Sequence, residues 1–217
     1  ACHANDAKSA IYDTIAFDDA VAVAVDFMQN HPTETLIIVT GDHECGGLTL
    51  GFAGTNYETA FEVLNDQSMS YEMFNFVEFS AHKAAYQVSD WDPVTDNMNA
   101  DIKSRIETAF GLVYDNLNDY EKELLEESYD KSMMQAQIPS GINKDWISYG
   151  YYEPFTVTCT HVLNRQAGIS FSSYSHTSVP VPVYAIGYDA WRFDGYYENT
   201  DIAKRLARAL RVSLNDN

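Results

Sequence analysis

An aspartate and a histidine stand side by side shortly after a strongly apolar segment, and this pair carries most of the chemistry that the sequence offers. The apolar segment is residues 36–39, and the pair is Asp42 and His43. Neighbouring carboxylate and imidazole groups can both ligate one borderline cation such as Zn²⁺. Because sites in open α/β sheets lie beyond the carboxyl ends of strands, the pair stands where a metal site is expected.

Three of the six histidines share this setting, a short polar loop next to an apolar segment. They are His3, His43 and His176. Loops on a rigid scaffold carry function disproportionately, although a single loop histidine is more often solvated than ligating. The other three are interpreted as structural. We expect His31 and His82 on the surface of helical segments, and His161 packed or hydrogen-bonded in a strand-like stretch.

The charge balance limits the kinds of partner. With 13 basic and 32 acidic residues the formal net charge is -19, which argues against nucleic acid and anionic lipid as partners. A solvated acidic surface explains such a balance, and affinity for Ca²⁺, Mg²⁺ or Zn²⁺ is the more specific alternative. No segment approaches the roughly 18 to 20 apolar residues of a membrane span. Cys2, Cys45 and Cys159 fit neither a CxxC zinc pattern nor a disulfide framework.

The elements that must position these residues can be read from periodicity. Phe17, Val21, Val25 and Met28 recur at helical spacing, and Pro32 ends that helix. Residues 36–39 lack polar alternation, so we expect a strand buried on both faces of a parallel sheet covered by helices. A helix leading into such a strand is the repeat of α/β folds.

The rest of the chain changes character twice. Residues 57–147 are acidic and rich in Tyr and Met, with Asn118 and Glu121 placed as a capping box, which predicts a helical region. From about Tyr149 the stretches FTVTCTHVL and GISFSSYSHTSVPVPVYAIG are typical of strands. A last helix is predicted to start at Asn199 or Thr200. Its apolar face would hold Ile202, Leu206, Ala209 and Leu210.

Four stretches, CHANDA, TLIIVTGDHECGG, AGISFSSYSHTSVPVPVYAIG and FDGYYENTDIA, resemble the C-terminal part of alkaline phosphatases, in that order. The resemblance implies a three-layer α/β/α sandwich, incomplete in this chain. It assigns residues 1–54 and 150–217 to that α/β domain and residues 55–149 to an acidic, mainly helical insertion. It also implies two Zn²⁺ and one Mg²⁺, and a serine that attacks a phosphate monoester to form a phosphoserine intermediate.

The resemblance assigns metal ligands residue by residue. His3 matches the histidine of a D-x-x-x-H zinc motif, whose aspartate would fall ahead of Ala1. His176 matches the histidine of an H-T-G motif at the same zinc, although Ser178 stands where glycine is usual. Asp42 and His43 match the D-H pair of the second zinc.

No catalytic residue is expected within the chain itself. The D-S-A triplet of the nucleophile does not occur, and Ser9 and Ser173 are interpreted as ordinary polar residues. The resemblance places the nucleophile and most Mg²⁺ ligands upstream, so we interpret the chain as the C-terminal fragment of an alkaline phosphatase, inactive by itself. Its partners would be a phosphate monoester and the missing N-terminal part of the same protein. A homodimer and a periplasmic or secreted location also follow from the family.

Two alternatives stay open. One is another metallohydrolase of the same superfamily, a phosphodiesterase or sulfatase, because the D-H pair and the distal histidine recur there. VPVYAIG together with ENTDIA favours the phosphatase. The other alternative is a non-catalytic module whose histidines hold a structural metal.

Overall fold

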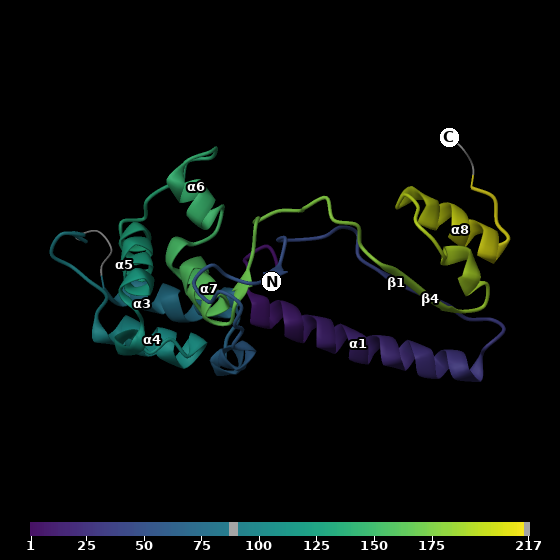
Figure 1. The fold of residues 1–217 in the computed structure, drawn as a ribbon, viewed down its shortest axis with the longest axis horizontal. Helices are drawn as coiled ribbons and strands as arrows, with labels where there is room; N and C mark the ends of the chain where they lie inside the picture. Colours follow the sequence, from purple (N-terminus) through teal and green to yellow (C-terminus); the bar gives the residue numbers. More distant parts are fainter. Residues whose placement is uncertain (87–90, 215–217) are drawn as a thin grey trace. The chain divides into compact units, whose positions relative to one another are not determined.

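The computed structural model describes residues 1–86 and 91–214 of the 217-residue chain (Figure 1). The chain divides into two compact units, each formed by two separate stretches of sequence. Unit 1 consists of Ala1–Tyr12 and Cys45–His176, and unit 2 consists of Asp13–Glu44 and Thr177–Asn217. Within the described ranges, no helix is both long and apolar enough to cross a membrane.

The first helix, α1, spans Ala7–Asn30 and begins well before the predicted start at Phe17. Its start is fixed by Asp6, whose Oδ1 accepts a hydrogen bond from the backbone N–H of Ser9 at 3.0 Å. An aspartate at this position satisfies one of the unpaired N–H groups of the first turn. The helix ends before Pro32, as predicted, because proline cannot continue it.

Unit 1 is mainly helical. Its elements after α1 are η1 (Phe61–Asp66), α2 (Tyr71–Met73), the π-helix η2 (Phe74–Phe79), α3 (Ser80–Ala85), α4 (Ala100–Phe110), η4 (Tyr114–Asn116), α5 (Asp119–Met133), α6 (Lys144–Tyr149) and α7 (Pro154–Gln166). The capping box of Asn118 and Glu121 at the start of α5 is confirmed. Helices thus occupy most of residues 55–149, while the division of the chain at residues 54 and 150 stays a prediction.

Helix α7 corrects the prediction of a strand for FTVTCTHVL. Pro154 occupies its first turn, and the Glu153 side chain caps it by accepting from the backbone N–H of Thr156 at 2.8 Å. Every residue from 154 to 160 is buried, and α7 packs against α4, α5 and α6. Burial on all sides removes the helical periodicity from the sequence. Packing then overrides the β propensity of its Thr and Val residues.

The core of unit 1 surrounds α7 with aromatic rings. The Phe155 ring lies 5.0 Å from that of Phe79 and 5.1 Å from that of Tyr129, measured between centroids. Phe74 and Phe110 extend the cluster, with centroids 4.9 Å apart. A short antiparallel pair, β2 (Thr49–Leu50) with β3 (Ile169–Ser170), lies next to this core. Large buried rings contribute most of the apolar area that holds such a unit together.

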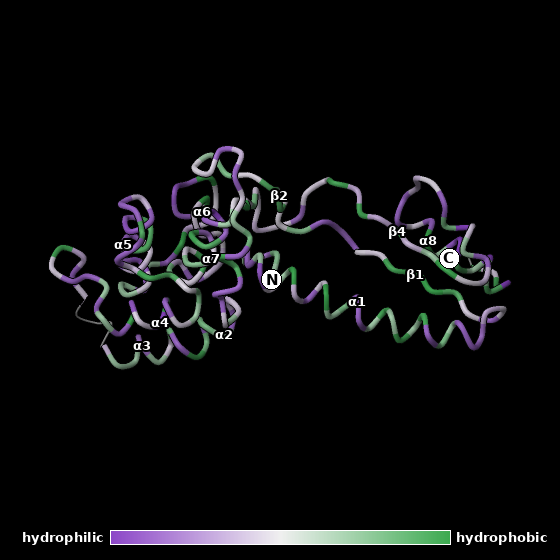
Figure 2. Tube along the Cα trace, turned by 60° about the horizontal axis from the view of Figure 1, so that its bottom comes forward, coloured by the Kyte–Doolittle hydropathy of each residue, from purple (hydrophilic) through white to green (hydrophobic). Residues whose placement is uncertain are grey.

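Unit 2 contains the predicted strand after α1. Strand β1 (Leu36–Thr40) pairs with β4 (Val183–Gly187), from Leu36 opposite Gly187 to Thr40 opposite Val183. The pairing is antiparallel and the apolar residues of β1 are only half-buried, so the prediction of a parallel strand buried on both faces was wrong. The half-burial follows because, within the described residues, β1 has a single partner strand. Figure 2 shows β1 in the colours of hydrophobic residues.

The last helix, α8, spans Thr200–Leu210 and follows the short η5 (Ala190–Phe193). The predicted start is confirmed, although the Asn199 side chain makes no capping hydrogen bond. The predicted apolar face is only partly covered. Ala209 is buried, whereas Leu206 and Leu210 are exposed.

Candidate metal-binding site

The fold brings His3 and His176 together within unit 1 although they lie 173 residues apart. Their ring centroids are 5.3 Å apart, with the ring planes inclined at 54°. Nδ1 of His3 lies 2.8 Å from the carbonyl oxygen of Tyr174. Because a carbonyl can only accept, Nδ1 carries the hydrogen and Nε2 of the neutral ring carries the lone pair. This is the tautomer in which a histidine ligates a metal through Nε2.

The separation of the two rings fits a shared tetrahedral metal. Zinc lies 2.0–2.1 Å from an imidazole nitrogen, so each ring centroid would lie about 3.2 Å from it. Two such rings at the tetrahedral angle have centroids about 5.2 Å apart. The observed 5.3 Å agrees with this arrangement.

Asn5 holds the turn that carries His3. Its backbone has a left-handed conformation, with φ of 50°, and its side chain is buried. Nδ2 donates to the carbonyl oxygens of Cys2 at 3.0 Å and Ser173 at 2.9 Å, while Oδ1 lies 3.1 Å from Nε2 of His161. The Asn5 carbonyl accepts from the Asn164 amide at 2.6 Å. One residue therefore joins the N-terminal turn to α7 and to the loop before His176.

His161 is a structural member of this network, and its predicted role as a packed, hydrogen-bonded residue is confirmed, although it lies in a helix. Burial and the nearby Arg165 lower the pKa of His161 to about 3. The ring is therefore neutral near pH 7. With Nε2 facing the amide oxygen of Asn5, Nε2 carries the hydrogen and donates.

The loop before His176 is also fixed by Gly46. Its N–H donates to the carbonyl of Ser175 at 2.8 Å, and its carbonyl accepts from the N–H groups of Ser172 and Ser173, both at 3.1 Å. Gly46 has φ of 85°, and a Cβ there would meet the Cys2 carbonyl oxygen at 2.8 Å. The position requires glycine, since both the conformation and the close approach exclude a side chain.

Asp42 and His43 form the second pair, in unit 2. Nδ1 of His43 lies 3.0 Å from the carbonyl of Glu44 and so donates to it, while Nε2 lies 3.2 Å from Oδ2 of Asp42. A lone pair on Nε2 facing a carboxylate oxygen is favourable only when a proton or a metal cation lies between them. Nitrogen and oxygen ligands of one tetrahedral zinc lie about 3.4 Å apart, close to the observed 3.2 Å.

Glu44, the next residue along, was not identified from the sequence. Its Oε2 accepts from the backbone N–H of Thr177 at 3.1 Å and also from the Thr177 hydroxyl. This contact joins the loop of Asp42 and His43 to the residue that follows His176. The only signal in the sequence was a third polar side chain in the same short loop.

The four predicted ligands thus form two pairs, one in each unit. Among residues 1–86 and 91–214, no three His, Cys, Asp or Glu side chains lie close enough to hold a metal ion. Structural zinc normally has four protein ligands and catalytic zinc three. Each pair has donors and a spacing that fit zinc, but each has fewer donors than either kind of site normally uses.

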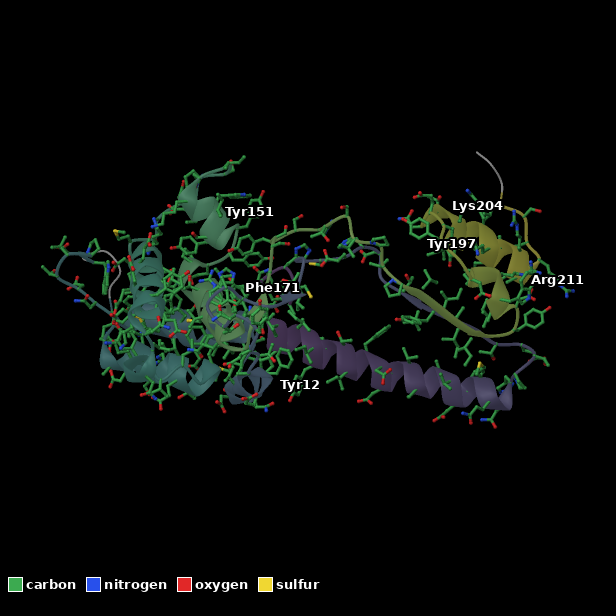
Figure 3. The ribbon with its side chains drawn as sticks, viewed as in Figure 1. Tyr12, Tyr151, Phe171, Tyr197, Lys204 and Arg211 are labelled. Atoms are coloured by element: carbon green, nitrogen blue, oxygen red, sulfur yellow. The ribbon has the colours of Figure 1, made fainter. Side chains whose placement is uncertain are left out.

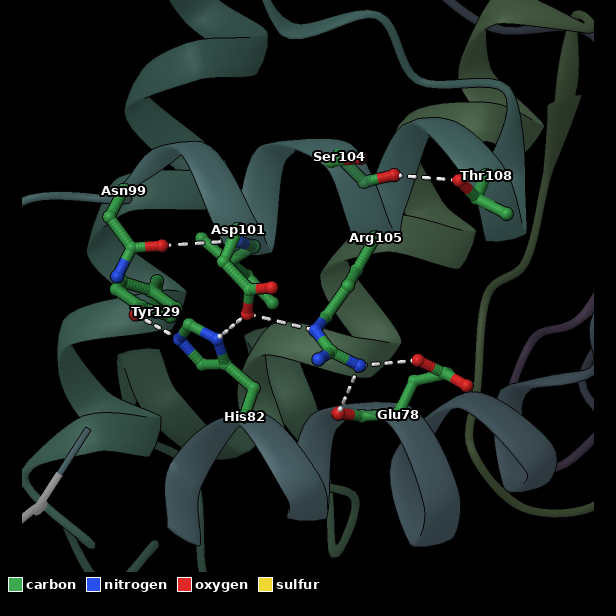
Figure 4. A network of polar contacts seen from close by, with 9 residues as sticks. Glu78, His82, Asn99, Asp101, Ser104, Arg105, Thr108 and Tyr129 are labelled. Carbon is green, nitrogen blue, oxygen red and sulfur yellow. Dashed lines mark hydrogen bonds and ion pairs between the residues drawn. The ribbon is translucent and has the colours of Figure 1, made fainter. Parts of the chain in front are cut away.

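His82 corrects the prediction of a surface histidine. Its side chain is fully buried, with Nδ1 2.7 Å from Oδ2 of Asp101 and Nε2 2.6 Å from the Tyr129 hydroxyl (Figure 4). Arg105 binds the same carboxylate oxygen at 2.9 Å and also forms an ion pair with Glu78. Burial lowers the pKa of His82 despite the nearby carboxylate. The network joins α3, α4 and α5. The helical pattern of the residues around His82 could not reveal these contacts, because they are made with other helices.

The remaining side chains of the sequence analysis have ordinary roles. His31 is exposed after α1, as predicted. The Ser9 hydroxyl donates to Asp6 at 2.8 Å, and the Ser173 hydroxyl accepts from the backbone N–H of Ser175 at 2.9 Å. Both serines are thus engaged in local turns. Cys159 is buried in α7, and burial raises its thiol pKa.

Comparison with known proteins finds relatives among the alkaline phosphatases. The chain is 25% identical over 215 residues to alkaline phosphatase 3 of Bacillus subtilis, covering 99% of this chain and 38% of that protein. It is also 25% identical to the repressible alkaline phosphatase of Saccharomyces cerevisiae, covering 99% of this chain and 35% of that protein. The chain therefore spans little more than a third of the length of these relatives.

Solved structures show the same type of fold. A cold-active alkaline phosphatase from a psychrophilic Shewanella species matches 97% of this chain with a TM-score of 0.64 and 23% identity, over 42% of its own chain. The Thermus thermophilus alkaline phosphatase matches 98% of this chain with a TM-score of 0.64 and 19% identity, over 41% of its own chain. The family model for alkaline phosphatase matches residues 1–212, and the chain belongs to that family.

Proposed function

We propose that this chain is the zinc-binding C-terminal part of an alkaline phosphatase that hydrolyses phosphate monoesters through a phosphoserine intermediate. The serine nucleophile and most Mg²⁺ ligands would lie in sequence outside residues 1–217. The observation that carries the proposal is the pairing of His3 with His176. Two histidines far apart in sequence lie at the spacing of two ligands of one metal, and the tautomer of His3 suits that role.

In this proposal His3 and His176 hold one zinc, and Asp42 and His43 hold the other. Bound zinc would supply the local positive charge that draws a phosphate dianion to a protein of net charge -19. The protein's own residues fix the ligands. The Tyr174 carbonyl sets the tautomer of His3, the Glu44 carbonyl sets that of His43, and Nε2 is presented in both cases.

The wider setting is proposed from the family. Sequence outside this chain would complete a three-layer α/β/α sandwich by adding strands on one side of the β1–β4 pair, so that one of the two strands stays at the edge. A periplasmic or secreted location and a homodimer are proposed on the same basis. The antiparallel pairing of β1 with β4 is compatible with such a sheet, because an antiparallel strand at the edge of a parallel sheet is common.

The test uses the complete protein that contains this chain, purified with zinc. We expect His176→Ala to remove one zinc per molecule and to lower the hydrolysis of p-nitrophenyl phosphate, with partial recovery in excess zinc. The matched control is His31→Ala, because His31 is exposed. His82→Ala is unsuitable, because His82 is buried and hydrogen-bonded. Equal zinc content and activity in the two variants would refute the ligand assignment.

The same preparation separates the proposed activity from its alternatives. Bis(p-nitrophenyl) phosphate reports a phosphodiesterase, and p-nitrophenyl sulfate reports a sulfatase. We expect the monoester to be the preferred substrate. Zinc binding that depends on His176, without hydrolysis of any of the three compounds, would instead indicate a non-catalytic metal-binding module.

A further inference from the structure

Unit 1 contains a cleft of about 560 Å³ that the metal ligands do not account for. It lies between α6, α7 and the segment 169–175. Its volume falls within the range of small-molecule sites, which is about 300–1,000 Å³. All the residues that line it belong to unit 1.

Six aromatic side chains are among the residues that line the cleft. They are Phe52, Trp146, Tyr149, Tyr151, Phe171 and Tyr174. Trp146 and Tyr151 meet edge to face, with centroids 4.2 Å apart. Tyr151 is 82% exposed, so it can contact a ligand without loss of core packing. Figure 3 labels Tyr151, which follows α6, and Phe171, which follows β3. Such a lining favours a ligand with a flat aromatic ring, because that ring can make stacked or edge-to-face contacts with the aromatic side chains at little entropic cost.

The charges around the cleft differ from those of the whole chain. Lys144 and Glu127 lie on its wall and neutralise each other at 2.6 Å. Arg165 also lines the cleft and contacts the Tyr120 hydroxyl at 3.2 Å and the face of Phe52, neither of which carries an opposite charge. The charge of Arg165 therefore remains as a net positive charge on the wall of the cleft. In a strongly acidic protein, this local positive charge lowers the electrostatic barrier to an anionic ligand.

Tyr174 connects the cleft to the candidate metal site. Its ring lines the cleft, while its carbonyl accepts the hydrogen bond that orients His3. Ser175 also lines the cleft and directly precedes His176. Gly150 packs against the Tyr174 ring so closely that a Cβ there would lie 2.8 Å from it. Tyr174 therefore contributes both to the cleft and to the position of His3.

We propose that the cleft receives the aromatic leaving group of a phosphate monoester and so makes aryl phosphates preferred substrates. This proposal rests on the proposed function, because it takes the two histidines to mark the phosphate end of the substrate. The occupant is identified by its chemistry, a planar ring joined to a dianion. The aromatic side chains of the cleft would contact the planar ring, and the charge of Arg165 would favour the approach of the dianion.

The first experiment measures binding without turnover. Saturation-transfer NMR of the chain in EDTA would use phenyl phosphate and propyl phosphate, which differ only in the group that the cleft should recognise. We expect saturation of the phenyl protons to fall at least twofold in Tyr151→Ala and to be retained in Tyr151→Phe. Tyr57→Ala is the matched control, since Tyr57 is fully exposed in unit 1 and does not line the cleft. Equal saturation in Tyr151→Ala and Tyr57→Ala would overturn the proposal.

The second experiment measures specificity in the complete protein. The ratio of kcat/KM for phenyl phosphate to that for propyl phosphate should fall about two- to tenfold in Tyr151→Ala and stay constant in Tyr57→Ala. An unchanged ratio would overturn the proposal even if the enzyme is active. If instead the protein hydrolyses no phosphate ester but the NMR difference is present, the proposed function fails while the cleft remains an aromatic-anion site.

Discussion

In His3 and His43, a hydrogen bond from Nδ1 to a backbone carbonyl determines how the ring is oriented. In each ring Nδ1 donates to a backbone carbonyl, that of Tyr174 for His3 and that of Glu44 for His43. The backbone thereby fixes the tautomer without using a second side chain. Because carbonyl positions follow from the fold rather than from residue identity, this orientation of the rings leaves no trace in the sequence.

The partly buried His161 predicts a pH dependence of stability. Burial lowers its pKa from 6.5 to about 3 in the folded chain, whereas the unfolded chain takes up a proton near pH 6.5. Its contribution to the free energy of unfolding is therefore complete above pH 6.5 and is lost progressively between pH 6.5 and 3. For one such group, the free energy of unfolding changes by up to about 1.4 kcal/mol per pH unit.

The measurement is urea unfolding of the chain at pH 7 and at pH 5, with His161→Gln and His31→Gln as a pair. Glutamine can still offer an N–H to Asn5 but does not titrate. We expect His161→Gln to reduce the loss of stability between the two pH values by about 2 kcal/mol, and His31→Gln, at an exposed position, to leave it unchanged. An equal loss in both variants would mean that His161 titrates normally in the folded chain.

At the residue scale, reasoning from the sequence alone could propose as ligands only residues that are adjacent. Asp42 and His43 could be proposed from their position after an apolar segment. The pairing of His3 with His176 came only through family resemblance, because nothing local connects them. The roles of Asn5 and Tyr174 could not be predicted, since the contact of Asn5 with His161 spans 156 residues and that of Tyr174 with His3 spans 171.

Among the elements, the N-terminal turn of residues 1–6 depends on α7 for its position. The Asn5 side chain and carbonyl bind His161 and Asn164, both on α7, and Thr160 of α7 donates to the carbonyl of Ala4 at 3.3 Å. A short turn has no core of its own, so these bonds fix His3. Because α7 was predicted as a strand, the contacts that support the turn of His3 could not be foreseen.

Substitution of Asn5 tests this dependence. Asn5→Gly keeps the left-handed backbone accessible but removes the side-chain hydrogen bonds, and we expect it to destabilise the chain by about 2–4 kcal/mol. The ring ¹⁵N shifts of His3 should also change, because the Tyr174 carbonyl would no longer hold Nδ1. Asn56→Gly is the control, since Asn56 has φ of 54° in an exposed turn. If both variants lose equal stability and His3 keeps its shifts, Asn5 does not position the turn.

The sequence located most elements but not how they pair. The α5 capping box, the strand predicted at 36–39 and the helix predicted to start at Asn199 or Thr200 follow from local signals, and each is present. The direction of the strand, and whether residues 154–166 form a helix or a strand, depend on the neighbouring elements that pack against each segment. A strand flanked by unknown neighbours looks the same in sequence whether it pairs parallel or antiparallel.

On the scale of the whole molecule, unit 2 exposes much apolar surface. Large side chains on α1, β4 and α8 are exposed, among them Val23 at 70%, Tyr184 at 65% and Leu210 at 65%. A two-stranded sheet such as β1–β4 is marginally stable alone and has open edges. The chain also spans only 35–42% of the lengths of the relatives described above. Both facts agree with a unit whose apolar faces are covered by sequence outside this chain.

The last prediction follows from the proposed function and concerns residues 1–217 by themselves. Each pair of predicted ligands supplies two donors, and two protein ligands hold zinc weakly. The two serines considered as nucleophiles, Ser9 and Ser173, are engaged in turns. We therefore expect no steady hydrolysis of p-nitrophenyl phosphate by the purified chain at any concentration of added Zn²⁺ and Mg²⁺. The assay should include His43→Ala, purified in parallel, because a contaminating phosphatase would act equally in both preparations. The prediction fails if the chain hydrolyses the substrate and His43→Ala abolishes that hydrolysis. The nucleophile would then lie within residues 1–217, and the remaining zinc ligands would come from the same chain.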